Sequence, residues 1–190
     1  MDLRDKWNSR YKASAAAPKA ARVLLENRHL LPVNGHALDV ACGLGGNAIE
    51  LARHGLQVDA FDLSDIAIAG LQERASQNNV SIHTLVCDIE QTPLAPQKYD
   101  VIVVSYFLSR PLFPSLMAAL KPGGLMYYQT FTQSKVSERG PQNPDFRLAD
   151  QELLSLLAGF HLLVYREEGC VGNTLEGFRD ELMYVGMKPM

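Results

Sequence analysis

The chain has 190 residues, a hydrophobic fraction of 47% and a formal net charge of −3. These values are typical of one globular domain and argue against a basic nucleic-acid-binding face. No apolar run approaches the roughly 20 residues that a membrane-spanning helix needs, and the first twelve residues lack the apolar core of a signal peptide. Three scattered cysteines and the spacing of the histidines give no support for disulfides or a metal site. We therefore expect a cytoplasmic protein, monomeric or homodimeric, with no metal and with no nucleic-acid or membrane partner.

Segments typical of helices and strands alternate along the chain. Pro18 is expected to open a helix that continues to about Arg28. Further helices are expected at 45–55, 64–78, 111–121 and 148–159. Strands are expected at 36–42, 56–63, 81–88, 99–107, 124–131, 160–169 and 180–189.

This alternation predicts an α/β fold with a doubly wound, mostly parallel sheet of seven strands. The last two expected strands are separated by about a dozen residues without a helical pattern, whereas a crossover to a parallel strand usually contains a helix. They therefore favour an antiparallel hairpin at the sheet edge, so that the last strand runs antiparallel.

A glycine-rich turn follows the first expected strand. Residues 38–52 read LDVACGLGGNAIELA, with Gly43, Gly45 and Gly46 between the strand and the next helix. Glycine lacks Cβ, so a ligand can approach the main chain closely and positive φ is tolerated. Ala48 completes a G-x-G-x-x-G/A pattern, and doubly wound sheets bind ligands at this edge. The glycines alone leave a nucleotide cofactor, a phosphate and a simple turn as alternatives.

Two acids follow the neighbouring strands. Asp62 ends the second strand, where a carboxylate can accept both hydroxyls of a ribose. Asp88 ends the third strand, within reach of an adenine amine, and Leu63 and Ile89 can sandwich the ring. Either acid by itself is better explained as a helix cap or a solvated loop residue. Together, beside the glycine turn, they favour a nucleoside-containing ligand.

Five segments in this order resemble the successive motifs of class I S-adenosylmethionine-dependent methyltransferases: LDVACGLGGNAIELA, VDAFDLS, VCDIE, YDVIVVSYF and LKPGGLMYY. The resemblance covers about residues 36–131 and implies a Rossmann-like fold with S-adenosylmethionine as cofactor. The N-terminal KWNSRY is similar to the tellurite-resistance and thiopurine methyltransferase groups, in which a W-x-x-R-[YW] arm lies over the cofactor.

The resemblance also implies roles for matching positions. Asp39, the Ala41 carbonyl and the glycines would hold the methionine portion of the cofactor, and Asp62 its ribose. Ser105 and Tyr106 would face the sulfonium and the incoming substrate, which makes Tyr106 the candidate catalytic residue. The expected cofactor contacts are Trp7, Arg10, Asp39, Ala41, Gly43, Gly45, Asn47, Asp62, Leu63, Ser64, Asp88, Ile89 and Ser105.

The N-terminal arm is expected to be a lid. Trp7, Arg10 and Tyr11 share one helical face, where Arg10 can pair with the cofactor carboxylate and the aromatic rings can exclude water. Residues 13–17 would be the hinge. The alternative is a helix that packs Trp7 permanently on the sheet edge. We thus expect one domain, 1–190, divided into an arm (1–17), a cofactor-binding core (18–131) and a substrate loop with the C-terminal strands (132–190).

Acceptor contacts are expected outside the cofactor motifs. Phe107 and Arg110 follow the fourth strand, and Arg139 and Arg147 lie in a long loop and could hold an anion, although each arginine is equally explained as a solvated surface residue. The absence of an [NDS]-P-P-[YF] motif disfavours nucleic-acid and glutamine acceptors. We expect a small-molecule methyl acceptor, such as a thiol or chalcogen compound. A nicotinamide-dependent oxidoreductase and a non-catalytic nucleotide-binding regulatory domain remain as alternatives.

Overall fold

A computed structural model of the chain describes residues 2–13 and 18–190. Seven strands form one sheet in the order β3-β2-β1-β4-β5-β7-β6. The strands are β1 (His36–Val40), β2 (Gln57–Asp62), β3 (Ile82–Val86), β4 (Tyr99–Ser105), β5 (Leu120–Phe131), β6 (His161–Glu167) and β7 (Glu181–Met187). Strands β3, β2, β1, β4 and β5 pair in parallel, whereas β7 pairs antiparallel with both β5 and β6. The predicted fold class, including the antiparallel last strand, is confirmed.

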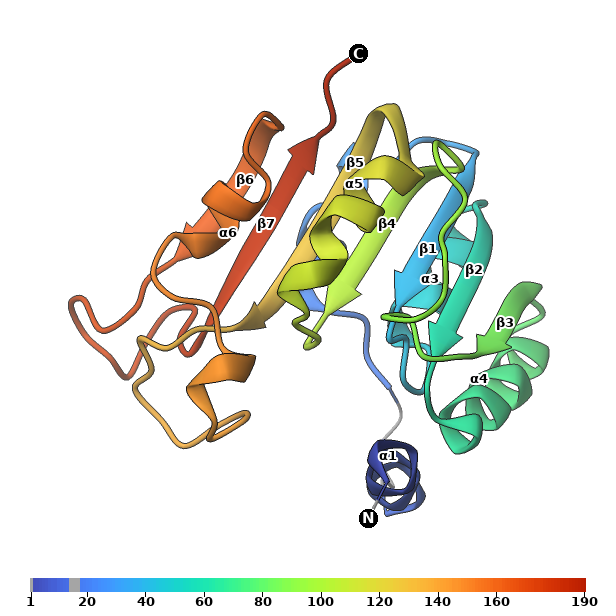
Figure 1. Ribbon diagram of the computed structural model, residues 1–190, viewed down its shortest axis with the longest axis horizontal. Coiled ribbons are helices and arrows are strands. Elements are labelled where there is room, and N and C mark those ends of the chain that lie inside the picture. Colours follow the sequence, from blue (N-terminus) through green and yellow to red (C-terminus); the bar gives the residue numbers. More distant parts are fainter. Residues whose placement is uncertain (1, 14–17) are drawn as a thin grey trace.

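The strand order reverses between β1 and β4, because the chain passes outward through β2 and β3 before it returns to pair β4 with β1. In doubly wound sheets, the carboxyl ends of the strands at such a reversal are the usual ligand site. Figure 1 shows the arrowheads of β1, β2 and β4 at the same edge of the sheet. Helix α1 (Leu3–Lys12) lies beyond this edge, where it contacts the start of α4 (Asp65–Gln77).

Six helices and three short turns accompany the sheet in the described part of the chain. The helices are α1 (Leu3–Lys12), α2 (Arg22–Glu26), α3 (Gly46–Arg53), α4 (Asp65–Gln77), α5 (Phe113–Ala119) and α6 (Glu152–Leu156), with 3₁₀ turns η1 (Arg28–Leu30), η2 (Arg110–Leu112) and η3 (Pro144–Phe146). Helices α2 to α6 cover the two faces of the sheet, and α1 lies beyond its edge. Alternate residues of the central strands point into two cores, so Ala37 and Val101 pack with α2, α3 and α4, whereas Leu38 and Ile102 pack with α5 and α6. Burial on both faces explains why these strands read as continuous apolar runs.

Several predicted boundaries are wrong. The second helix begins at Arg22 and not at Pro18, because Ala21 is extended, with ψ of 148°. The backbone N–H group of Ala21 donates a hydrogen bond to Asn47 Oδ1, and that of Val23 donates to Gln129 Oε1, each at 2.8 Å. At the C-terminal end, β6 and β7 form the expected antiparallel pair at the sheet edge, with β7 between β5 and β6. Positions 14–17 of the predicted hinge lie outside the described residues.

Candidate functional site

The glycine turn adopts left-handed backbone at three positions. Ala41, Gly43 and Gly45 have φ of 51°, 52° and 84°, and Gly45 is the N-cap of α3. A Cβ on Gly43 would lie 2.9 Å from the hydroxyl oxygen of Tyr11, and one on Gly45 would lie 2.1 Å from Leu71. Positive φ favours glycine at both positions, and at Gly45 a Cβ would also overlap the buried Leu71. The bare backbone of Gly43 faces the N-terminal arm.

Asp62 faces this turn from the end of β2. Its Oδ2 atom accepts a hydrogen bond from Gly43 N at 2.7 Å, and Oδ1 accepts one from Ser64 N at 2.8 Å. Burial raises the pKa of Asp62, although these backbone hydrogen bonds act in the opposite direction. Ser64 is buried and caps α4, because its hydroxyl accepts from Ala67 N at 3.1 Å. The turn and the acid are thus one hydrogen-bonded unit.

Asp39 lies buried behind the turn. It accepts hydrogen bonds from Ala48 N at 3.0 Å and from Asn47 Nδ2 at 3.3 Å. Burial raises the pKa of Asp39 to about 7, an increase that the bonds from Asn47 and Ala48 partly offset. Asn47 Nδ2 also donates to Ser105 Oγ at 2.8 Å. The structure therefore joins three predicted cofactor residues from β1, α3 and β4 at the reversal of strand order.

The predicted adenine contacts lie one strand further out. Asp62 pairs with Val86 in the β2–β3 register, so the residues just after both strands are neighbours. Ile89 is buried, Leu63 is half-buried and Asp88 is exposed. The Oδ1 atom of Asp88 accepts a hydrogen bond from Glu90 N at 3.0 Å. An exposed carboxylate beside apolar side chains is an arrangement that suits a purine ring and its amine.

The predicted face of α1 is present. Trp7 and Tyr11 stack with ring centroids 5.9 Å apart, and the Cζ atom of Arg10 lies 5.3 Å from the Trp7 ring centroid. Asn8 fixes the helix to α4, because its Nδ2 donates to Asp65 at 2.8 Å and its Oδ1 accepts from Ser64 Oγ at 2.6 Å. Arg10 itself is exposed.

Tyr11 brings the arm against the acid of β2. Burial first, and then the charge of Asp62, raise the pKa of Tyr11 above its ordinary value. The arm therefore covers the glycine turn and approaches the acid at the end of β2.

Tyr106 belongs to a second polar cluster, at the ends of β4, β5 and β7. Its hydroxyl donates to Glu181 Oε2 at 3.1 Å, and Gln129 Nε2 donates to the Tyr106 oxygen at 2.9 Å and to Glu181 Oε2 at 2.7 Å. Arg139 Nη2 donates to Glu181 Oε1 at 2.7 Å. Gln129 and Glu181 were not among the residues predicted from the sequence. A polar residue at the carboxyl end of an apolar strand was the available signal for Gln129.

Two of the predicted acceptor residues are engaged in holding loops. Arg147 is buried, and its guanidinium donates to the carbonyls of Thr132, Pro141 and Arg139. We therefore no longer expect Arg147 to bind an anion, because its guanidinium is buried and each of its three nitrogens already donates to a backbone carbonyl. Arg110 forms a bidentate pair with Glu152, at 2.6 and 3.0 Å.

The other two residues differ in exposure. Phe107 is partly buried against the α5–α6 core. The Arg139 side chain is 62% exposed, so it alone among the four predicted residues presents most of its surface to solvent.

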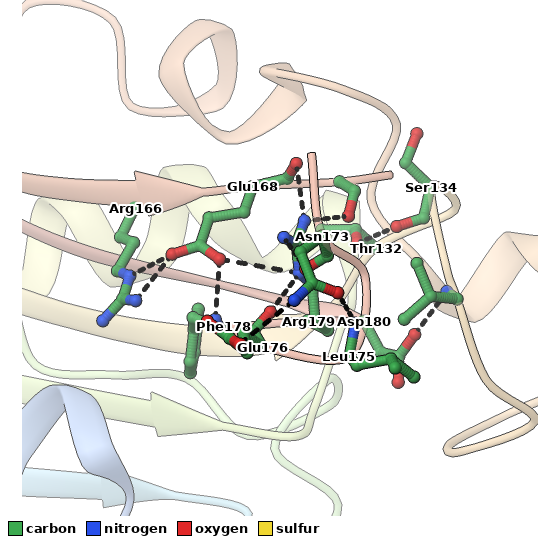
Figure 2. A network of polar contacts seen from close by, with 12 residues as sticks. Thr132, Ser134, Arg166, Glu168, Asn173, Leu175, Glu176, Phe178, Arg179 and Asp180 are labelled. Carbon is green, nitrogen blue, oxygen red and sulfur yellow. Dashed lines mark hydrogen bonds and ion pairs between the residues drawn. The ribbon is translucent and has the colours of Figure 1, made fainter. Parts of the chain in front are cut away.

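Polar contacts hold the loop between β6 and β7. Figure 2 shows Glu168 between Arg166 and the backbone of Phe178, which donates to Glu168 Oε2 at 2.8 Å. Next along the chain, Asp180 accepts from the backbone nitrogens of Val136 and Ser137 at 2.6 and 3.0 Å. These contacts fix the start of β7 against the 132–148 loop.

A family model described as a methyltransferase domain matches residues 37–124, a span that contains the glycine turn, Asp39, Asp62 and Tyr106. Residues 37–124 are thus similar to the domain of S-adenosylmethionine-dependent methyltransferases. Among the described residues of the chain, no helix is long and apolar enough to cross a membrane.

Curated methyltransferases are similar to part of the chain. The ubiquinone biosynthesis O-methyltransferase of Coxiella burnetii is 32% identical over 104 residues, 52% of this chain and 44% of that protein. TehB of Haemophilus influenzae is 34% identical over 87 residues, 44% of this chain and 30% of that protein. The chain thus spans about half the length, or less, of the curated relatives it matches.

Solved structures share the fold of the methyltransferase domain. The crystal structure of TehB has a TM-score of 0.71 at 22% identity, covering 97% of this chain and 66% of that chain. A methyltransferase structure from Methanosarcina mazei has a TM-score of 0.70 at 18% identity, covering 91% and 100%. At these identities the likeness shows the fold alone.

Proposed function

We propose that this protein transfers a methyl group from S-adenosylmethionine to a small-molecule acceptor, such as a thiol or chalcogen compound, by in-line displacement. The observation that carries the proposal is that Asp39 and Asp62, from adjacent parallel strands, flank one glycine turn at the reversal of strand order. When bound, the sulfonium of the cofactor supplies a methyl group on an already activated carbon. The protein then mainly has to align the reactants and exclude water.

The side chains present fit this cofactor. Asp62 is an acceptor-only carboxylate that can take both ribose hydroxyls, as in dinucleotide-binding sheets. Asp39 would pair with the amino group of the methionine portion, next to the left-handed turn from Ala41 to Gly45. Ile89 and Leu63 are apolar and Asp88 is exposed beside them, which suits an adenine ring and its amine.

The acceptor site would lie between Tyr106 and the 132–148 loop. Tyr106 and Phe131 pack with ring centroids 5.3 Å apart, and Arg139 reaches over to Glu181 from this loop. The exposed part of the Arg139 guanidinium would bind an anionic group of the acceptor. On the other side, α1 would act as a lid over the cofactor, held by Asn8. The division into arm, core and substrate loop stays a prediction of the same proposal.

A screen with methyl-labelled S-adenosylmethionine tests this function. The acceptors to assay are small thiols, selenite, tellurite, thiopurines and small phenols, with the Asp62→Ala variant as control. We expect transfer of label to one of these classes, and loss of transfer in the variant. Cofactor binding without transfer to any class would favour the regulatory-domain alternative. Preferential binding of NAD would favour the oxidoreductase.

A further inference from the structure

Three adjacent strands bring a tyrosine, an amide and a carboxylate together. Tyr106 follows β4, Gln129 lies in β5 and Glu181 begins β7, so the sheet order places them side by side. Glu181 is only 4% exposed. It accepts hydrogen bonds on Oε2 from Tyr106 and Gln129 and on Oε1 from Arg139. The buried carboxylate thus acts as the common acceptor of three donors.

The orientation of the Gln129 amide is fixed by the backbone. Its Oε1 accepts from Val23 N at 2.8 Å, and a backbone N–H can only donate. The other amide atom, Nε2, must therefore be the one directed at Tyr106 and Glu181. Gln129 is completely buried, so its amide keeps this orientation within the core.

The orientation of Gln129 in turn fixes the hydroxyl of Tyr106. A phenol has one O–H donor and two acceptor lone pairs. The donor is directed at Glu181, and one lone pair receives the N–H of Gln129. One acceptor lone pair therefore remains. Tyr106 is 47% exposed and has a left-handed backbone with φ of 56°, a conformation that bulky residues adopt mainly where the surrounding structure imposes it.

We propose that Glu181 is a positioning residue: with Gln129, it orients Tyr106 to present a hydrogen-bond acceptor, which selects methyl acceptors whose reacting group is a neutral donor. The acceptor class is then a hydroxyl, a thiol or an amine, and not an oxyanion that lacks a proton. This inference rests on the proposed methyl transfer and names the chemistry of its acceptor. The new bond from methyl to acceptor replaces the sulfonium–methyl bond, S-adenosylhomocysteine leaves, and the acceptor's proton passes to the solvent at the half-exposed Tyr106. Burial, together with the charge of Glu181, raises the pKa of Tyr106 to about 12, so the phenol keeps its proton at neutral pH and does not act as a base.

A fluorine label at position 106 tests the arrangement without any turnover. The variant has 3-fluorotyrosine in place of Tyr106, and ¹⁹F NMR gives the phenol pKa. The groups that face this phenol are Glu181, Gln129 and Arg139. We expect Glu181→Leu to lower the pKa because a negative charge is removed, and Arg139→Gln to raise it because a positive charge is removed. Glu138→Gln, an exposed acid next to Arg139, is the matched control and should change nothing.

The second measurement uses phenol and anisole as matched probes, titrated into the labelled protein saturated with S-adenosylhomocysteine. Phenol can donate a hydrogen bond and anisole cannot. We expect the ¹⁹F resonance to report phenol binding about fivefold tighter than anisole, the value of one neutral hydrogen bond. The preference should disappear in Glu181→Leu, where the Tyr106 proton is free to turn toward the probe.

The outcomes are distinguishable from a failure of the proposed function. No calorimetric binding of S-adenosylhomocysteine would overturn the methyltransferase proposal, whereas the pKa comparison would still report on Tyr106. The inference is overturned if neither Glu181→Leu nor Arg139→Gln moves the phenol pKa in the folded protein. It is equally overturned if phenol and anisole produce the same response, or if neither produces one. Should Glu181→Leu fail to fold by thermal melting, the Arg139→Gln shift alone decides.

Discussion

The Oδ2 atom of Asp62 accepts a hydrogen bond of 2.7 Å from the backbone nitrogen of Gly43, nineteen residues earlier in the chain. This bond joins the end of β2 to the turn after β1. The second carboxylate oxygen is held by Ser64 N at 2.8 Å. The orientation of the acid is therefore set before any ligand arrives, which lowers the cost of ordering it on binding.

Replacing this acid should weaken cofactor binding selectively. Each hydrogen bond to a charged acceptor is worth roughly 1.5–3 kcal/mol. Loss of the two ribose bonds in Asp62→Ala should therefore weaken S-adenosylhomocysteine binding about a hundredfold or more. Calorimetry on the variant measures this, with the exposed Glu73→Ala as control for loss of charge. An Asp62→Ala protein with unchanged affinity and reduced melting temperature would show that this acid only supports α4.

The pH dependence of binding should report Asp39. The pKa of this buried carboxyl is about 7, and the positively charged amino group of the cofactor favours the ionised form. At a pH below this pKa, Asp39 must therefore lose its proton when the cofactor binds. Affinity for S-adenosylhomocysteine should rise about tenfold per pH unit up to about pH 7 and level off above it.

Proton release can be measured directly by calorimetry in two buffers of different ionisation enthalpy. At pH 6 we expect close to one proton released per cofactor bound. In Asp39→Asn, affinity should be weaker and independent of pH over this range. If the affinity of the unchanged protein does not vary between pH 5.5 and 8, ionisation of Asp39 does not contribute to cofactor binding.

Replacement of Arg147 should mainly lower the free energy of unfolding, whereas replacement of Arg139 should mainly affect turnover. Arg147 holds three carbonyls from a buried position. Arg147→Met should therefore cost about 3 kcal/mol or more of unfolding free energy, since buried partners are left unpaired. Arg139→Met should cost less, because its guanidinium is largely exposed, and should weaken turnover of anionic acceptors. Urea denaturation of both variants checks the order, and equal losses would contradict it.

The N-terminal arm should respond to cofactor. Trp7 is the only tryptophan and stacks on Tyr11, whose hydroxyl lies against Gly43. Saturation with S-adenosylhomocysteine should therefore shift the fluorescence of Trp7. Deletion of residues 1–12 should weaken cofactor binding while the remaining chain stays folded.

The control for the arm is Trp7→Phe, which should abolish the fluorescence signal. A permanently packed helix predicts the opposite pattern: silent fluorescence and early melting of the truncated protein. Silent fluorescence together with full affinity after truncation would remove the lid from the mechanism.

The order of strands and helices could be predicted because hydrophobic patterning is local. Val101 and Ile102 point to opposite cores, so β4 is a continuous apolar run, and this run predicts a buried strand. The start of α2 could not be predicted, because it depends on residues that are distant in the chain. The N–H groups of Ala21 and Val23 donate hydrogen bonds to the side chains of Asn47 and Gln129. Pro18 is a favourable first helical residue, but tertiary hydrogen bonds outweigh that preference here.

The positions of the candidate site residues were predictable where a motif is compact and not where residues are assembled from distant strands. Asp39, Asp62 and the glycines lie in consecutive elements, and the structure brings them together. Glu181 was missed, although the antiparallel direction of the last strand already implied that its first residue lies at the carboxyl edge. Arg147 was misjudged because burial within an irregular loop has no periodic signature.

The most direct test of the account is a calorimetric titration of the full chain with S-adenosylhomocysteine. The account predicts saturable binding of one ligand per chain, competition by S-adenosylmethionine and none by NAD. The absence of heat, together with an unchanged melting temperature at millimolar S-adenosylmethionine, would contradict it.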